Sequence, residues 1–147
     1  MNKPSYSIVS PERNFYSFVS SGKNGEILKA VVFDEFLPNT FNLALLDYDA
    51  VNNVWSDTVS TNNGDMPKVM ATVVAIIDEF LKESPTVKVY FEGNTVSKNS
   101  LYNRIIRNNF DYLSSSYEIW AKPEGNAEPY LLGKDYKGFY IYKKEAK

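Results

Sequence analysis

Apolar and polar residues alternate over much of the first half of the chain, in the manner of β-strands. Aromatic and β-branched residues fill positions 15–19, and a turn sequence with two glycines follows at 21–25. The extended pattern resumes over 27–36 and 41–48, with a proline turn between these two segments. Because such short turns join antiparallel neighbours, the pattern predicts a three-stranded meander.

The pattern changes to a helical one in the middle of the chain. Apolar residues recur every three or four positions between residues 66 and 83, which predicts an amphipathic helix. Asp65 is expected to cap this helix, Pro67 suits its first turn, and Pro85 should end it. Ser97 is expected to cap a second helix that runs to about residue 109.

Three further segments are expected to be strands, at 86–91, 117–120 and 136–142. The sequence therefore predicts an α+β fold, with an antiparallel meander sheet of about five to six strands and two helices. The predicted order is β-β-β-α-β-α-β-β. The ribonuclease-H-like fold begins with the same order, but residues 15–19 lack the acidic residue that its two-metal site needs in the first strand.

Length and composition narrow the class of protein. A chain of 147 residues is the size of one domain, with an ordered core expected over about 13–144. It has no cysteine and no histidine, so thiolate nucleophiles, imidazole bases and the usual zinc ligands are excluded. No apolar run is long enough for a membrane helix or placed like that of a signal peptide, so we expect a cytoplasmic protein without a cofactor.

Charge is unevenly distributed along the chain. The net charge of −2 argues against strong general binding of nucleic acid. Residues 33–66 carry acidic side chains and no lysine or arginine, whereas residues 94–110 carry basic side chains and no acid. An acidic face of one copy could therefore meet a basic face of another, which makes a homodimer a reasonable expectation.

Several segments between residues 14 and 142 form a recognisable set. The most specific is Ser60-Thr61-Asn62-Asn63-Gly64-Asp65, followed by Lys68-Val69-Met70-Ala71-Thr72. The others are 14–18, 41–44, 89–95 and 100–105. Together they resemble a small bacterial family of single-domain proteins of unknown function, in which arginine often stands at the position of Lys98 or Asn99. The resemblance implies a single-domain bacterial protein and no particular activity.

Four carboxylates are candidate metal ligands. Asp47 and Asp49 stand two positions apart at the end of an expected strand, so their side chains share a face. Asp65 precedes the first helix, and Glu92 ends the strand at 86–91. Oxygen ligands of this kind suit Mg²⁺, and such a site would make the protein a hydrolase or nuclease. The alternative is that these acids are solvated strand ends and a helix cap.

Two stretches are candidate binding sites. The first is the polar loop with Asn62, Asn63 and Gly64, which leads into a helix N-terminus and so could bind an anion. The second is the helix that follows Ser97, with the residues Lys98, Tyr102, Arg104 and Arg107. Lys98, Asn99, Asn103 and Arg107 are expected mostly on its outer side, where they could contact a phosphate backbone or an acidic partner. The alternatives are that the loop only forms a turn and that the helix only presents a solvated face.

The functional hypotheses differ in the kind of ligand. The first is a non-enzymatic binding protein with a protein partner, because aromatic residues are plentiful and no nucleophile–base pair or cofactor loop is present. The second is a Mg²⁺-dependent hydrolase or nuclease that uses the four carboxylates. The third is binding of single-stranded nucleic acid along the tyrosine-rich strand at 136–142, where every second side chain could stack a base.

Overall fold

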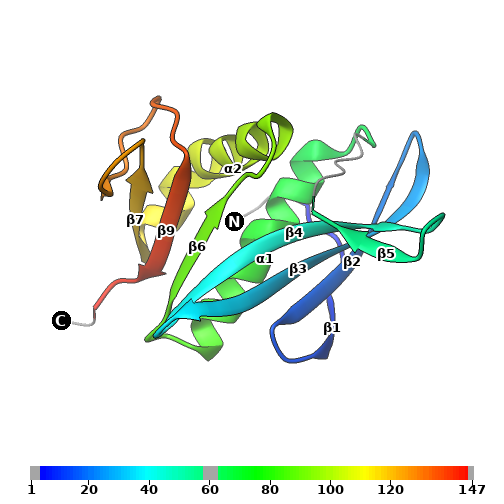
Figure 1. Cartoon of the computed structure of the whole chain (residues 1–147), viewed down its shortest axis with the longest axis horizontal. Coiled ribbons are helices and arrows are strands. Elements are labelled where there is room, and N and C mark those ends of the chain that lie inside the picture. Colours follow the sequence, from blue (N-terminus) through cyan, green and yellow to red (C-terminus); the bar gives the residue numbers. More distant parts are fainter. Residues whose placement is uncertain (1–3, 58–62, 146–147) are drawn as a thin grey trace.

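The computed structural model describes residues 4–57 and 63–145 (Figure 1). The elements in this part of the chain are β1 (Val9–Glu12), β2 (Phe15–Gly22), β3 (Gly25–Leu37), β4 (Thr40–Asp49), β5 (Val54–Ser56), α1 (Met66–Glu83), β6 (Lys88–Glu92), α2 (Val96–Ser114), β7 (Tyr117–Lys122), β8 (Glu128–Pro129) and β9 (Gly138–Lys143). The predicted α+β class is confirmed, and the eight predicted elements occur in the predicted order. Neither helix has the length and apolar character that a membrane span requires.

The strands of the described residues form one mixed sheet. Its order is β1-β2-β3-β4-β6-β9-β7-β8, with β5 paired to β4 beside this path. Neighbouring strands are antiparallel except for β4 and β6, which are parallel. A parallel pair needs a crossover connection, and α1 lies within that connection.

Three strands were not expected, namely β1, β5 and β8. They have 4, 3 and 2 residues, which is too short for an alternating pattern to be recognised. β1 and β8 also contain a proline, which is normally a sign against a strand. The fold thus begins before residue 13, where the sequence placed the start of the ordered core.

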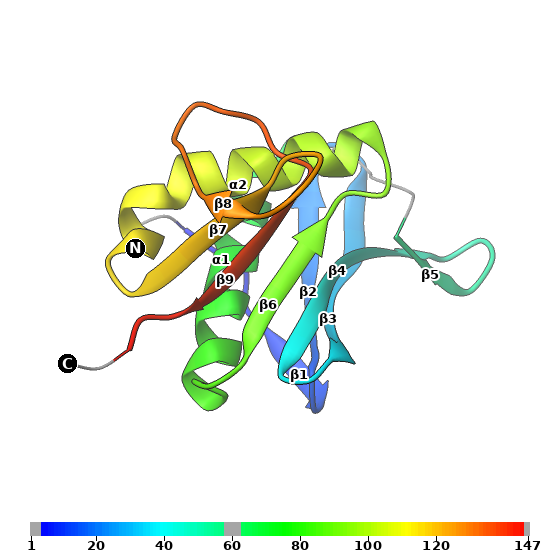
Figure 2. The same cartoon turned by 60° about the vertical axis from the view of Figure 1, so that its left-hand side comes forward.

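Both helices lie on one face of the sheet (Figures 1 and 2). On the strands the side chains toward the helices are buried, and Phe33 of β3 stacks on Phe80 of α1 with ring centroids 3.9 Å apart. Phe91 of β6 packs edge-on against Tyr102 of α2 at 5.1 Å. A single hydrophobic core therefore fills the space between the sheet and the two helices.

The opposite face of the sheet carries no helix of the described residues (Figure 2). We call it the open face. Strand alternation and the register of the pairs assign its side chains, and its large apolar members are Phe15, Val19, Leu28, Val32, Phe36, Leu46, Tyr48, Tyr90, Trp120, Tyr140 and Tyr142.

The boundaries of α1 are the predicted ones, but those of α2 are not. Thr95, and not Ser97, caps α2, and its side-chain oxygen accepts a hydrogen bond from the backbone N–H of Lys98 at 3.1 Å. The helix continues to Ser114, five residues beyond the expected end. Asn103 is buried and not on the outer side, because its side chain bonds the backbone N–H and C=O of Tyr136 at 2.8 and 2.9 Å.

Gly93 allows the end of β6 to pass close to α2. A Cβ atom at this position would lie 2.1 Å from the backbone nitrogen of Asn99. We therefore expect Gly93→Ala to force α2 away from the sheet and to lower the free energy of unfolding by about 1–3 kcal/mol. Urea denaturation measures this loss. The matched control is Gly125→Ala, where a Cβ meets nothing within 4 Å; equal stability of the two variants would contradict the prediction.

Candidate functional site

The turn between β2 and β3 is held by the segment that precedes α1. The Asn63 side chain donates hydrogen bonds to the carbonyl of Gly25 at 2.9 Å and to the Ser20 hydroxyl at 3.1 Å. Its Oδ1 accepts from the backbone N–H of Asn24 at 2.6 Å. Asn63 is buried, so it connects two parts of the fold. Asn62, the other candidate in this pair, lies outside the described residues.

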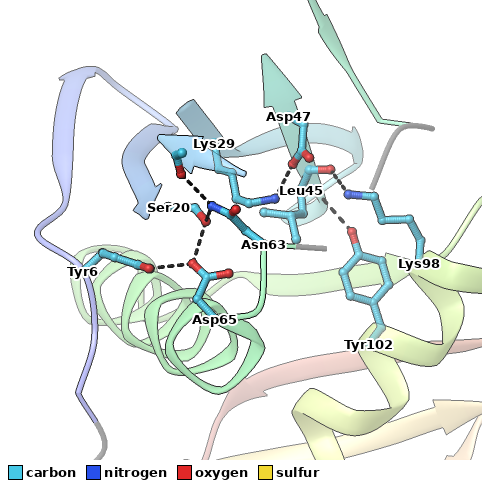
Figure 3. Close-up of polar contacts among 10 residues, drawn as sticks. Tyr6, Ser20, Lys29, Leu45, Asp47, Asn63, Asp65, Lys98 and Tyr102 are labelled. Carbon is cyan, nitrogen blue, oxygen red and sulfur yellow. Dashed lines mark hydrogen bonds and ion pairs between the residues drawn. The ribbon is translucent and has the colours of Figure 1, made fainter. Parts of the chain in front are cut away.

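The next two residues of the same segment also have structural roles, and Figure 3 shows the contacts of Asp65. Gly64 adopts a left-handed backbone with φ of 79°, which favours glycine. The Asp65 carboxylate accepts hydrogen bonds from the hydroxyls of Tyr6 and Ser20, both at 2.5 Å. It does not cap α1 through its side chain. Asp65 therefore ties the N-terminal segment to the sheet, a role that no local sequence signal indicates.

The remaining candidate metal ligands have partners of different kinds. Asp47 is buried and forms an ion pair with Lys29 at 2.7 Å. Asp49 accepts hydrogen bonds from its own turn, and Glu92 accepts one from the Tyr90 hydroxyl at 3.0 Å. Over residues 4–57 and 63–145, no three acidic residues form a group that could hold a metal ion. The geometry of these acids thus gives the Mg²⁺ hypothesis no support.

A crevice opens where β4 and β6 diverge. The two strands pair only from Thr40 to Asn42 of β4, and β5 pairs with β4 from Asp47 onward. Between these two points no strand of the described residues pairs with the edge of β4, and a cavity of about 310 Å³ lies there. Its lining includes Asn42, Ala44, Leu45, Asp57, Glu92, Asn94 and Tyr102. The crevice therefore lies at the carboxyl end of β6 and beside the middle of β4.

Two side chains of α2 bond the backbone of β4 at this gap (Figure 3). Lys98 Nζ donates a hydrogen bond to the carbonyl oxygen of Leu45 at 2.7 Å, and the N–H of Leu45 donates one to the Tyr102 hydroxyl at 3.2 Å. Lys98 is 2% exposed, so its expected place on the outer side of the helix is wrong. Lys98 bonds the backbone of a strand that is distant in the sequence. The helical pattern around Lys98 contains no signal of this contact.

The Lys98 ammonium lies near another buried cation. Lys29 and Asp47 form a buried pair with each other, and Lys98 adds a second buried cation beside them. The pKa of the Lys98 amine is lowered to about 8, mainly by burial; Lys29 also lowers this pKa, while Asp47 and Asp57 act in the opposite direction. A lysine that is desolvated next to another cation is a recognised form of activated amine.

The two arginines expected to join Lys98 are not beside it. Arg107 is exposed and lies 3.7 Å from Asp135, and Arg104 is partly exposed. Lys98 and Tyr102 are buried against β4, so the four candidate residues of α2 do not form one basic surface. Of these four residues, Tyr102 lines the crevice.

The open face contains a second hollow. It has a volume of about 390 Å³ and lies among Leu37, Thr40, Lys88, Trp120, Ala127, Tyr140 and Tyr142. The Lys88 ammonium is 5.0 Å from the centre of the Tyr142 ring, and the Tyr90 and Tyr140 rings are 4.6 Å apart. The predicted alternation is present for Tyr140 and Tyr142, which lie on the open face, but not for Tyr136, which precedes β9 and is buried.

These features define a two-layer α+β domain with one covered sheet face, one open sheet face and a crevice between two parallel strands. The chain belongs to a family of unknown function, DUF6934, whose model matches residues 2–144. This confirms the resemblance to an uncharacterised family. Comparisons with curated proteins and with solved structures gave no match.

Replacing Asp47 tests whether it serves the Lys29 ion pair. Asp47→Asn leaves a buried ammonium without its counterion, so we expect the free energy of unfolding to fall by about 3 kcal/mol. Replacing both residues, as Lys29→Met with Asp47→Leu, should recover most of this loss. Thermal and urea denaturation measure both effects. An Asp47→Asn variant as stable as the wild type, which loses only a stabilisation by Mg²⁺, would instead support the metal hypothesis.

The Lys98 amine should make stability depend on pH. Between pH 8 and 10.5 the unfolded chain still holds a proton that the folded chain has released, so the folded state gains stability as the pH rises. We expect the difference in unfolding free energy between wild type and Lys98→Met to grow by about 1–3 kcal/mol across this window. The tyrosines titrate in both proteins, so their contributions to the unfolding free energy cancel in this difference. A difference that is constant with pH would show that folding does not change the pKa of the Lys98 amine.

Proposed function

We propose that this protein is a non-enzymatic binding protein that holds a partner protein on its open face. The observation that carries this proposal is the set of apolar side chains on the open face. Phe36 is 49% exposed and the neighbouring Leu37 55%, while Val19 and Leu28, which face each other on β2 and β3, are 41% and 39% exposed. Large apolar side chains that gather on one exposed face are a common feature of surfaces that bind a partner.

The residue types of the open face support a protein partner. Tyrosine, tryptophan and phenylalanine are the residues that contribute most to protein interfaces. Tyr90, Tyr140 and Trp120 lie on three neighbouring strands in directly paired positions. The Tyr90 and Tyr140 rings are 4.6 Å apart, and with Trp120 they would bury a large apolar area against a partner.

Charges on the open face support a partner that is not a nucleic acid. On β2, β3 and β4 the charged residues of the open face are Glu26 and Asp34, with no lysine or arginine among them. On the other half of the sheet, lysines and glutamates are equal in number, as Lys88 and Lys122 against Glu92 and Glu118. An acidic apolar surface suits a basic, apolar protein segment and repels phosphates. The cysteine-free composition fits the bacterial cytoplasm as the setting.

Single-stranded nucleic acid is the second candidate, and the hollow on the open face favours it. Trp120, Tyr140 and Tyr142 could stack a base while Lys88 neutralises a phosphate. This hypothesis requires affinity that falls steeply with salt. The acidic residues on the same face make it the weaker of the two.

Phe36→Glu tests the proposed function, because it places a charge in the apolar surface without touching the buried core. We expect wild type and Val96→Glu, a control at a 90% exposed position on α2, to retain the same partner when crosslinked in the native host. Phe36→Glu should lose that partner while its melting temperature stays near that of the wild type. Identical partners for all three proteins would overturn the proposal.

Measurements on the same three proteins can also detect a partner of another kind, either a second copy of the chain or a nucleic acid. The mass in solution detects a second copy of the chain, and quenching of tryptophan fluorescence by a labelled oligonucleotide detects nucleic acid. A salt-sensitive oligonucleotide complex that Phe36→Glu abolishes would replace the protein partner with the second candidate.

A further inference from the structure

The hairpin of β3 and β4 extends past the end of β2 (Figure 1). The pairing of β2 with β3 ends at Val32, whereas the pairing of β4 with β3 runs to Leu37. On the β2 side of residues 34–37, no strand of the described residues pairs with β3. These four residues therefore form a short free edge inside the sheet, which we call the β3 overhang.

The backbone of the β3 overhang presents hydrogen-bonding groups at Glu35. The N–H of Phe33 donates a hydrogen bond to the carbonyl oxygen of Asn14, in the β1–β2 turn, at 2.9 Å. Because the backbone direction repeats at every second residue of an antiparallel strand, the N–H and C=O of Glu35 lie on the same side of β3, beyond the turn. A free edge of this kind is where an extended peptide can add to a sheet as a further strand.

The open-face side of the β3 overhang is apolar. Phe36 and Leu37 are 49% and 55% exposed, and the ring of Phe36 lies 6.0 Å from that of Tyr90. Leu37 lines the hollow that also contains Trp120 and Tyr140. An added strand would place every second side chain on this face. Apolar side chains at these positions would therefore continue the contact with the aromatic residues of the open face.

The helix side of the β3 overhang is acidic. The side chain of Glu35 lies on this side, because Glu35 is paired with Phe41, whose ring packs on α1. Burial and then the carboxylates of Glu83 and Glu79 raise the pKa of Tyr16 to about 12, so these two acids of α1 lie near the start of β2. The adjoining β1–β2 turn contributes one cation, at residue 13. Three carboxylates and one cation favour a basic segment on this side.

We infer that the partner on the open face is held through an extended basic segment that adds to the β3 overhang as a strand. The apolar side chains of this segment would lie on the open face beside Phe36, and its basic side chains would lie on the helix side, toward Glu35 and the end of α1. This inference rests on the proposed function and deepens it, because it names the kind of segment through which the partner binds.

A second copy of the chain does not suit the β3 overhang. If two overhangs paired with each other, Asp34 and Glu35 of one chain would lie beside the same acids of the other. Like charges on adjacent strands destabilise the pairing. The same acids repel phosphate groups, so the charges of the overhang select a basic peptide over both of these occupants.

Hydrogen exchange of the wild-type protein tests the inference with a synthetic peptide. The probe is a blocked peptide of six alternating valine and lysine residues, and the control peptide has glutamate in place of lysine. We expect millimolar probe to slow the exchange of the Glu35 N–H, followed by NMR, at least about fivefold. The control peptide should leave this exchange rate unchanged.

Glu35→Pro removes the N–H that an added strand needs. Proline is tolerated on a free edge, where its nitrogen faces solvent. The matched control is Glu35→Ala, which keeps the N–H and, like Glu35→Pro, loses the side-chain hydrogen bond to the backbone of Asn39. We expect the probe to bind Glu35→Pro at least about fivefold more weakly than Glu35→Ala. If Glu35→Pro fails to fold, the exchange measurement on the wild type decides alone.

The results separate this inference from the proposed function. A probe that leaves the exchange of the Glu35 N–H unchanged, or that binds folded Glu35→Pro as tightly as Glu35→Ala, would overturn the inference. Loss of the crosslinked partner by Phe36→Glu would then leave the proposed function in place. Retention of that partner by Phe36→Glu would overturn the proposed function and this inference together.

Discussion

The structure depends on the requirement that buried backbone groups find hydrogen-bond partners. Where β4 leaves β6, the N–H and C=O of Leu45 would be unpaired, and the Tyr102 hydroxyl and the Lys98 ammonium of α2 take the place of the missing strand. These two hydrogen bonds fix the position of α2 against the sheet. It also brings a second cation next to the Lys29–Asp47 pair, so the geometry of the sheet determines the charge distribution of the crevice.

The helices cover one face of the sheet, where the core lies, and leave the open face accessible to solvent. Aromatic side chains such as Phe33, Phe80 and Phe91 contact one another across the covered face and form the core. The open face repeats the same residue types without a covering layer. Any partner that binds there would complete a three-layer arrangement of the kind that larger α/β domains build from their own chain.

The sequence predicts the parts of this fold that have local signals. Strand alternation, the helical period from Met66 to Glu83 and the proline after it were sufficient for the class and order of the elements. The crevice had no such signal, because it arises from the divergence of two strands that are forty residues apart in sequence. From its helix alone, Lys98 is expected on the surface. From its loop alone, Asn63 is expected to bind a ligand, and Asp65 is expected to cap a helix. Their real partners, among them Tyr6, Ser20 and Gly25, come from distant segments.

The short terminal strands have a consequence for self-association. β1 has Pro11 near its end and β8 consists of Glu128 and Pro129; proline offers no N–H to an incoming strand. Sheets with long, regular borders can grow by adding strands from neighbouring molecules, which leads to fibres and aggregates. In this molecule both borders are brief and interrupted, so uncontrolled polymerisation is disfavoured even though a wide apolar surface is available to solvent.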